Sequence, residues 1–160
     1  YYSMAAAVSV LVSNAAGEGN RRQMRRVAGK GYVIMLALAT CSSLLFVLGG
    51  PHVIRFFTND PEVIAVALTL IVPLVLYQYG DATQINYANA LRGTANVMPM
   101  LWIAFVSYVM IGLPVTYLLA FPLNLGIYGI ILSFSVSLFL AAALFLYYFM
   151  RTTHLERDAR

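Results

Sequence analysis

The sequence predicts an all-α fold, a polytopic bundle of transmembrane helices, and three observations support this. Hydrophobic residues make up 61% of the 160 residues and charged residues only 10%, with a mean hydropathy of +0.80, whereas a soluble domain carries about 25% charged residues. Residues 93–150 include no Asp, Glu, Lys or Arg. The basic residues lie near the ends of apolar runs and form no stripe for nucleic acid. We therefore expect membrane lipid as a partner and no nucleic acid.

Residues 1–16 are predicted to be the tail of a helix whose start is missing. At about 1.5 Å per residue they reach roughly 24 Å, short of the ~30 Å hydrocarbon core. We therefore expect the chain to be part of a longer membrane protein. A second helix is predicted over 27–54, loosened near its end by Pro51. A basic connection with Arg21, Arg22, Arg25, Arg26 and Lys30 follows the first helix and overlaps the start of this one.

The third helix is predicted over 61–91. Asn59 or Asp60 can cap it, and Pro61 suits its first turn. Pro73 lies inside it and should kink it, because proline lacks the backbone N–H that a helix interior needs.

Two further helices are predicted over 97–121 and 126–151, because the uncharged stretch is too long for one span. Pro114 should bend the first of them. A polar tail, 152–160, follows the second.

The distribution of Lys and Arg predicts the orientation. Alternating the five segments places nine basic residues on one side: Arg21, Arg22, Arg25, Arg26, Lys30, Arg92, Arg151, Arg157 and Arg160. Only Arg55 lies on the other side. Excess positive charge marks the cytoplasmic side, so we expect a cytoplasmic C-terminus and tail. The odd number of segments predicts at least one more spanning helix upstream.

Asp81 is the one charged residue within 63–91. An ionised side chain at mid-membrane costs about 2.5–3.5 kcal/mol on insertion scales, and such residues usually serve a function. Asp81 lies eleven residues before Arg92, which is roughly 16 Å at helical rise. This depth is near the midplane, where secondary transporters bind their ions.

A polar stripe surrounds this carboxylate. In a helix, Tyr77, Asp81, Gln84 and Ala88 follow the i, i+4, i+7, i+11 spacing of one face, with Gln78 at its border. A carboxylate, a phenol and an amide oxygen supply hard ligands for a cation. The stripe therefore predicts cation binding by Asp81 with Tyr77, and Gln78 and Gln84 as possible lining of an ion or substrate path.

The competing interpretation is structural. In this interpretation Asp81 serves only to hold helices together. Gln78 and Gln84 are as well suited to interhelical hydrogen bonds as to the lining of an ion or substrate path. The serines at 133, 135 and 137 alternate around the last helix and are interpreted as packing residues.

Enzyme chemistry finds no support in the sequence. His52 and His154 have no second His or Cys at ligand spacing, so no zinc-type metal site is expected. The single cysteine, Cys41, excludes an intrachain disulfide. There is no nucleophile–base pair and no Gly-rich phosphate loop, so we predict a non-enzyme without a cofactor other than a coupling ion.

Six short motifs in order resemble the C-terminal part of the multidrug and toxic compound extrusion (MATE) family. These are the helix end Gly17-Glu18-Gly19-Asn20, the turn Phe57-Thr58-Asn59-Asp60-Pro61-Glu62-Val63, the helix segment Asp81-Ala82-Thr83-Gln84, the turn Leu91-Arg92-Gly93, and Gly112-Leu113-Pro114 and Leu125-Gly126-Ile127-Tyr128-Gly129. One departure is Thr94-Ala95-Asn96, where the family often has Gly-Asp-Thr.

The resemblance implies a twelve-helix transporter in two six-helix bundles, of which this chain would be the end of helix eight to helix twelve. The missing N-terminal bundle and helix seven would then be its partners. In the sodium-coupled branch the tenth helix carries a cation-binding Asp with a Tyr four residues before it, and these positions match Asp81 and Tyr77. The family's other acid, a Glu on helix seven, would lie outside this chain.

The expected function is a cation-coupled antiporter, driven by Na⁺ or H⁺, that exports amphipathic and cationic toxic compounds across the cell (inner) membrane. A lipid-linked precursor flippase of related fold is one alternative, disfavoured because no basic residue lies inside a segment. The other is a non-transport membrane module in which Asp81 only pairs helices.

Overall fold

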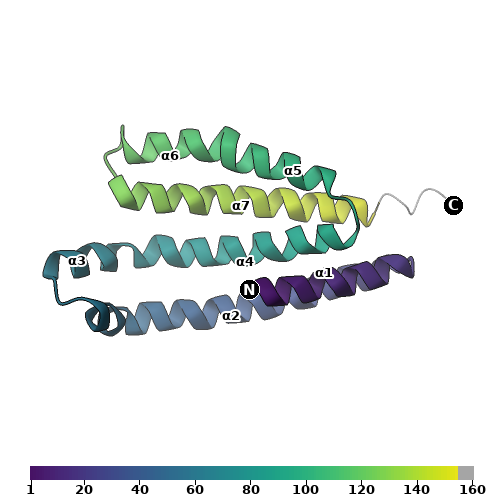
Figure 1. Cartoon of the computed structure of the whole chain (residues 1–160), viewed down its shortest axis with the longest axis horizontal. Coiled ribbons are helices and arrows are strands. Elements are labelled where there is room, and N and C mark those ends of the chain that lie inside the picture. The colour runs from purple at the N-terminus through teal and green to yellow at the C-terminus, as the bar shows by residue number, and fades with distance from the viewer. Residues whose placement is uncertain (155–160) are drawn as a thin grey trace.

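The computed structural model describes residues 1–154, and these residues form helices and short connections without a strand. Figure 1 shows the helices lying side by side in an antiparallel arrangement. Their bounds are α1 Tyr2–Gly17, α2 Arg21–Phe57, α3 Pro61–Thr69, α4 Ile71–Gly93, α5 Met98–Ala104, the π-helix η1 Phe105–Gly112, α6 Leu113–Ala120 and α7 Gly126–Thr152. Three spans are long and apolar enough to cross a membrane, or four if the bent pair α3–α4 counts as one. The predicted all-α membrane bundle is confirmed.

Helix α2 begins six residues earlier than predicted, so the basic residues at 21–26 are helical and do not form a connection. The Asn20 side chain accepts a hydrogen bond from the backbone N–H of Gln23, 3.1 Å away, and caps the helix. Arg and Lys are good helix formers, so nothing in this stretch opposes helix. The helix also continues past Pro51 to Phe57, and its last turns point away from the rest of its axis in Figure 1.

The predicted helix over 61–91 is two helices. α3 and α4 meet at Leu70 with a bend of 43°. Pro73 has no N–H to donate to the carbonyl of Thr69, so the helical hydrogen-bond ladder breaks one turn before the proline. The prediction that this segment bends was therefore right, but the break lies at Leu70 and separates two helices.

The predicted helix over 97–121 also differs from a regular α-helix. Its middle is the π-helix η1, which ends at Gly112, and Pro114 lies in the first turn of α6. Proline suits the first turn of a helix because it has no N–H to donate to the hydrogen bonds of the preceding turn. The change from π-helix to α-helix therefore falls at a place where one such bond is absent anyway.

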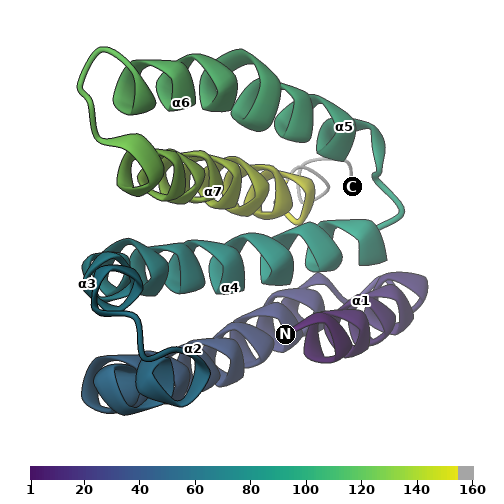
Figure 2. The ribbon, with the colours of Figure 1, turned by 60° about the vertical axis from the view of Figure 1, so that its left-hand side comes forward.

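Helix α4 is the centre of the bundle, in contact with α1, α2 and α7. Figure 2 shows α7 between α4 and the span formed by α5, η1 and α6. All three serines of α7 are buried. Ser133 bonds Thr116 of α6 over 2.7 Å, and Ser135 donates to the carbonyl of Pro73 on α4 over 3.2 Å. Their side chains hold α7 between its neighbours, in agreement with a packing role.

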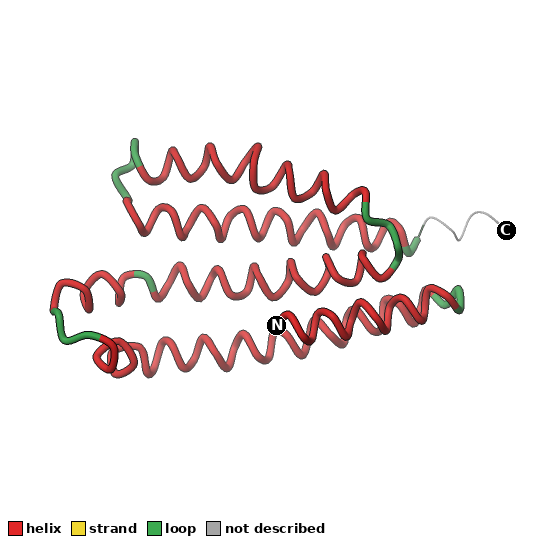
Figure 3. The backbone as a smooth tube through the Cα atoms, viewed as in Figure 1, coloured by secondary structure: helices red, strands yellow, loops and turns green. Residues whose placement is uncertain are grey.

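The connections gather at the two ends of the bundle, as the tube in Figure 3 shows. The turn before α2, the end of α4 and the end of α7 lie at one end (Figure 1). This end therefore carries the basic start of α2 together with Arg92 and Arg151, while Arg55 lies near the other end of α2. Arg157 and Arg160 of the predicted tail lie outside the described residues.

Candidate functional site

Helix α4 carries the polar stripe. It is α-helical from Ile71 to Gly93, so Tyr77 and Asp81 lie one turn apart on the same face, as the spacing predicts. The bend at Leu70 precedes this face, and Arg92 in the last turn follows it. The structure therefore keeps Asp81 well inside the apolar span and away from either end.

The faces on either side of Asp81 are occupied by other helices. The buried Ala82 packs in a cluster with Met35 and Ala39 of α2. Gly80 faces α7, where an added Cβ would lie 3.1 Å from the Cβ of Leu138. Asp81 lies between these two contact surfaces and is half-buried.

The Asp81 carboxylate has no hydrogen bond or ion pair with any other residue in the described part of the chain. It interacts electrostatically with three phenols, those of Tyr1, Tyr77 and Tyr108. These side chains come from the start of α1, from α4 itself and from η1. The three phenols and the N-terminal amino group of Tyr1 are thus within electrostatic range of the carboxylate, and no Lys, Arg or His side chain of the described residues pairs with it.

This arrangement offers oxygen ligands. The carboxylate is the one charged side chain of the group, and phenol oxygens can accept or donate. Tyr77 is 36% exposed, so the site is open on one side. Among residues 1–154, no three His, Cys, Asp or Glu side chains come together. A monovalent cation or a proton matches a single carboxylate better than a divalent ion does, because a divalent ion usually takes several charged ligands.

The two glutamines of the stripe have different surroundings. The Gln78 amide nitrogen donates to Ser42 over 2.9 Å, and its oxygen accepts from Ser43 over 2.9 Å. Both ends of this amide thus bridge α4 to α2, which supports an interhelical role, and path lining stays a prediction for Gln78. Gln84 is half-buried and has no hydrogen bond within the described residues, so path lining remains a prediction for it.

Two asparagines near the basic end of α4 are hydrogen-bonded within the bundle, and one of them bonds another helix. The Nδ2 of Asn86 donates to the carbonyl of Ala28 on α2 over 3.1 Å, while its buried Oδ1 has no partner. Asn89 donates back to the carbonyl of Ile85 in its own helix over 2.9 Å. They belong to the packing of α4 and not to the group around Asp81.

Tyr108 and Tyr1 were not predicted as parts of the site. The helical period reveals neighbours on one helix, whereas these tyrosines come from other helices. The only sequence signal for Tyr108 is a polar-tipped aromatic in the middle of an uncharged span, close before Gly112 and Pro114. That signal does not say which helix it faces.

A protein-family model described as MatE matches residues 1–118 of the chain. A probable multidrug resistance protein NorM of Pasteurella multocida is 32% identical to it over 162 residues, which cover 98% of this chain and 34% of the relative. The corresponding NorM of Chromobacterium violaceum is 35% identical over 163 residues, or 98% of this chain and 35% of the relative.

The multidrug resistance protein PmpM of Pseudomonas aeruginosa is 38% identical over 116 residues, which cover 72% of this chain and 24% of the relative. The chain thus spans about a third of the length of the NorM relatives and about a quarter of PmpM. The family match includes α1 to α4, and therefore the polar stripe around Asp81.

Proposed function

This chain belongs to the MatE family, the multidrug and toxic compound extrusion transporters, and we propose that it forms part of a cation-coupled antiporter that exports amphipathic, cationic compounds. The observation that carries the proposal is Asp81, a half-buried carboxylate inside an apolar helix with no internal partner in residues 1–154. The names of the relatives, multidrug resistance proteins, support the class of substrate.

Sodium or a proton is the proposed coupling ion. An unpaired carboxylate within a membrane is expensive, and a bound cation removes that cost. Tyr77, one turn away on the same face, would supply a second oxygen. Coupling requires that ion and drug prefer different conformations of the protein. The bend at Leu70 and the π-helix η1 are the two irregular places at which the helices near Asp81 could change shape.

Asp81→Asn in the full-length protein tests the proposal. In reconstituted vesicles carrying a sodium or a proton gradient, we expect ion-driven export of a cationic dye to fall at least about tenfold, as for loss of an interaction worth 1.4 kcal/mol. The matched control is Asp60→Asn, the same chemical change at the cap of α3, where Asn caps as well as Asp.

Two outcomes contradict the proposal. Undiminished ion-driven export by Asp81→Asn would remove the carboxylate from the mechanism. A lower melting temperature of the variant would instead favour a purely structural Asp81 if the native protein also showed no protection by sodium and no response of export to either a sodium or a pH gradient. Comparing the sodium gradient at fixed pH with a pH gradient in sodium-free buffer identifies the coupling ion.

A further inference from the structure

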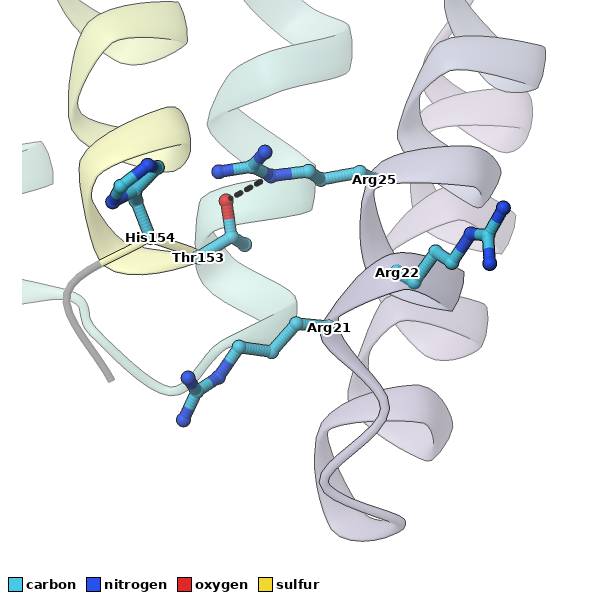
Figure 4. Close-up of a pocket in the computed structure, with 5 residues that line it drawn as sticks. All are labelled: Arg21, Arg22, Arg25, Thr153 and His154. Carbon is cyan, nitrogen blue, oxygen red and sulfur yellow. Dashed lines mark hydrogen bonds between the residues drawn. The ribbon is translucent and has the colours of Figure 1, made fainter. Parts of the chain in front are cut away.

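At the basic end of the bundle, the start of α2 and the end of α7 enclose a hollow of about 400 Å³. It is lined by Arg21, Arg22, Arg25, Thr153 and His154. Figure 4 shows Arg25 reaching from α2 to the last turn of α7, with His154 beside Thr153. The Nε of Arg25 donates to the Thr153 hydroxyl over 2.8 Å, and its guanidinium also donates to the carbonyl of Met150 over 3.2 Å.

Two further hollows adjoin this one and share Arg25. One, of about 510 Å³, lies along α2 and is lined by Arg25, Arg26, Gly29, Lys30, Val33 and Ile34. The other, of about 310 Å³, lies along α7 and is lined by Arg25, Tyr147, Met150, Arg151 and His154. The three hollows thus share one lining residue, Arg25, whose guanidinium is already fixed by its bonds to α7.

Within residues 1–154, the charges around these hollows are of one sign. Six Lys and Arg side chains line them, and no acidic side chain among the described residues does. Arg22, Arg26 and Lys30 are exposed and form no ion pair within residues 1–154. Such a cluster attracts an anion, and the guanidinium fork of Arg25 suits a phosphate group.

Apolar surface leads away from the charges. Val33 is 65% exposed and Ile34 46% exposed in the hollow along α2, and Tyr147 and Met150 are 58% and 44% exposed in the one along α7. These side chains belong to helices that are long and apolar enough to span a membrane, so their exposed surface is suited to lipid chains. A soluble anion would leave both apolar surfaces unused, whereas a phospholipid would use the charges and both surfaces together.

From this geometry we propose that the junction of α2 and α7 is a binding site for an anionic phospholipid. Its phosphate lies against Arg25, with Arg26, Lys30 and Arg151 around it, and its acyl chains run along the two apolar hollows. Basic hollows between membrane helices at the interface are suited to anionic head groups. The site is separate from the Asp81 site on α4 and does not depend on ion coupling.

Native mass spectrometry of the full-length protein tests this site, with phosphatidylglycerol and phosphatidylcholine of the same chains added in turn. We expect retention of phosphatidylglycerol in preference to phosphatidylcholine. The variant Arg22→Gln/Arg26→Gln/Lys30→Gln should lose affinity for phosphatidylglycerol, at about fivefold per neutralised cation. The matched control Arg22→Lys/Arg26→Lys keeps every charge and should keep the preference.

Equal retention of the two lipids by the wild type, or an unchanged preference in the triple variant, overturns the proposal. Glycerol 3-phosphate and inorganic phosphate test the contribution of the apolar surfaces. We expect neither to displace the lipid at millimolar concentration, and displacement would show a site for soluble anions instead. If the triple variant does not fold, Arg26→Gln and Lys30→Gln are measured singly, each with the same expected fivefold loss.

Discussion

The hydroxyl of Ser135 on α7 donates a hydrogen bond to the carbonyl oxygen of Pro73 on α4, 3.2 Å away. Pro73 stands in the first turn of α4, directly after the 43° bend at Leu70. The contact therefore attaches the irregular start of the central helix to α7, its most extensive neighbour.

Ser135→Ala is expected to destabilise the protein modestly. The serine also donates to the carbonyl of Ile131 in its own helix over 3.2 Å, so the interhelical bond is shared. Hydrogen bonds between membrane helices are worth about 0.6 kcal/mol on average, and we expect a loss of that order in thermal unfolding in detergent. Ser13→Ala, at an exposed position of α1, is the control and should change nothing. Identical unfolding of the two variants would contradict the structural role of Ser135.

The two glutamines of α4 should respond differently to replacement. Gln78→Ala removes both hydrogen bonds to Ser42 and Ser43 and should lower stability by about 1–2 kcal/mol. Gln84→Ala removes no internal bond, so stability should be unchanged, while dye export falls if Gln84 lines the path. The measurements are unfolding in detergent and export from vesicles. Equal stability of the two variants would refute the assignment of Gln78 to the α2–α4 contact.

Gly31 marks the closest approach of α2 to its neighbours. An added Cβ there would overlap Cγ2 of Val8 on α1 and lie 3.0 Å from Oδ1 of Asn86 on α4. Overpacking of this kind costs about 1–3 kcal/mol, so Gly31→Ala should lower the unfolding temperature. Gly29, on the same helix, has no atom within 4 Å of an added Cβ.

Gly29→Ala is therefore the matched control for Gly31→Ala. It should be neutral or stabilising by up to about 1 kcal/mol, because Ala is the better helix former. A stability loss as large in Gly29→Ala as in Gly31→Ala would mean that the packing of α1, α2 and α4 is not the reason for the glycine at 31.

The sequence predicted the helices that the hydrophobic pattern defines, and it predicted the stripe around Asp81. Both depend only on length, composition and the 3.6-residue period, which are local properties of a chain. The basic residues 21–26 favour a connection on charge alone, and this puts the predicted start of α2 too late. Asn20 caps a helix that contains them. The break at Leu70 depends on a missing hydrogen bond one turn before Pro73, so the proline marks the region but not the residue.

Relationships between helices could not be predicted in this way. The residue type of Gln78 suits both interhelical hydrogen bonding and path lining. Its hydrogen bonds depend on Ser42 and Ser43, which lie on another helix. Tyr108 lies in an uncharged, apolar span, and its relation to Asp81 depends on how η1 packs against α7, the helix between η1 and α4. A single sequence does not give the distances between side chains on different helices.

Tyr108→Phe tests whether the site around Asp81 extends beyond α4. The Tyr108 phenol interacts electrostatically with the Asp81 carboxylate, while its ring packs against the cluster that includes Ile103 and Phe145. Phenylalanine keeps the ring and removes only the hydroxyl, so folding should be preserved. If the hydroxyl helps to hold the coupling cation, the dissociation constant should rise by roughly tenfold or more, since hydrogen bonds to charged groups are worth about 1.5–3 kcal/mol.

The measurement is protection of the full-length protein by sodium in thermal unfolding, and in parallel the sodium or proton dependence of dye export. Tyr117→Phe is the control, because Tyr117 lies on α6, is 62% exposed, and has its ring 5.3 Å from that of Phe121 between centroids. Its ion dependence should match that of the wild type. An unchanged ion dependence in Tyr108→Phe would exclude Tyr108 from the site, since a phenol that ligates the cation cannot lose its oxygen without weakening the binding.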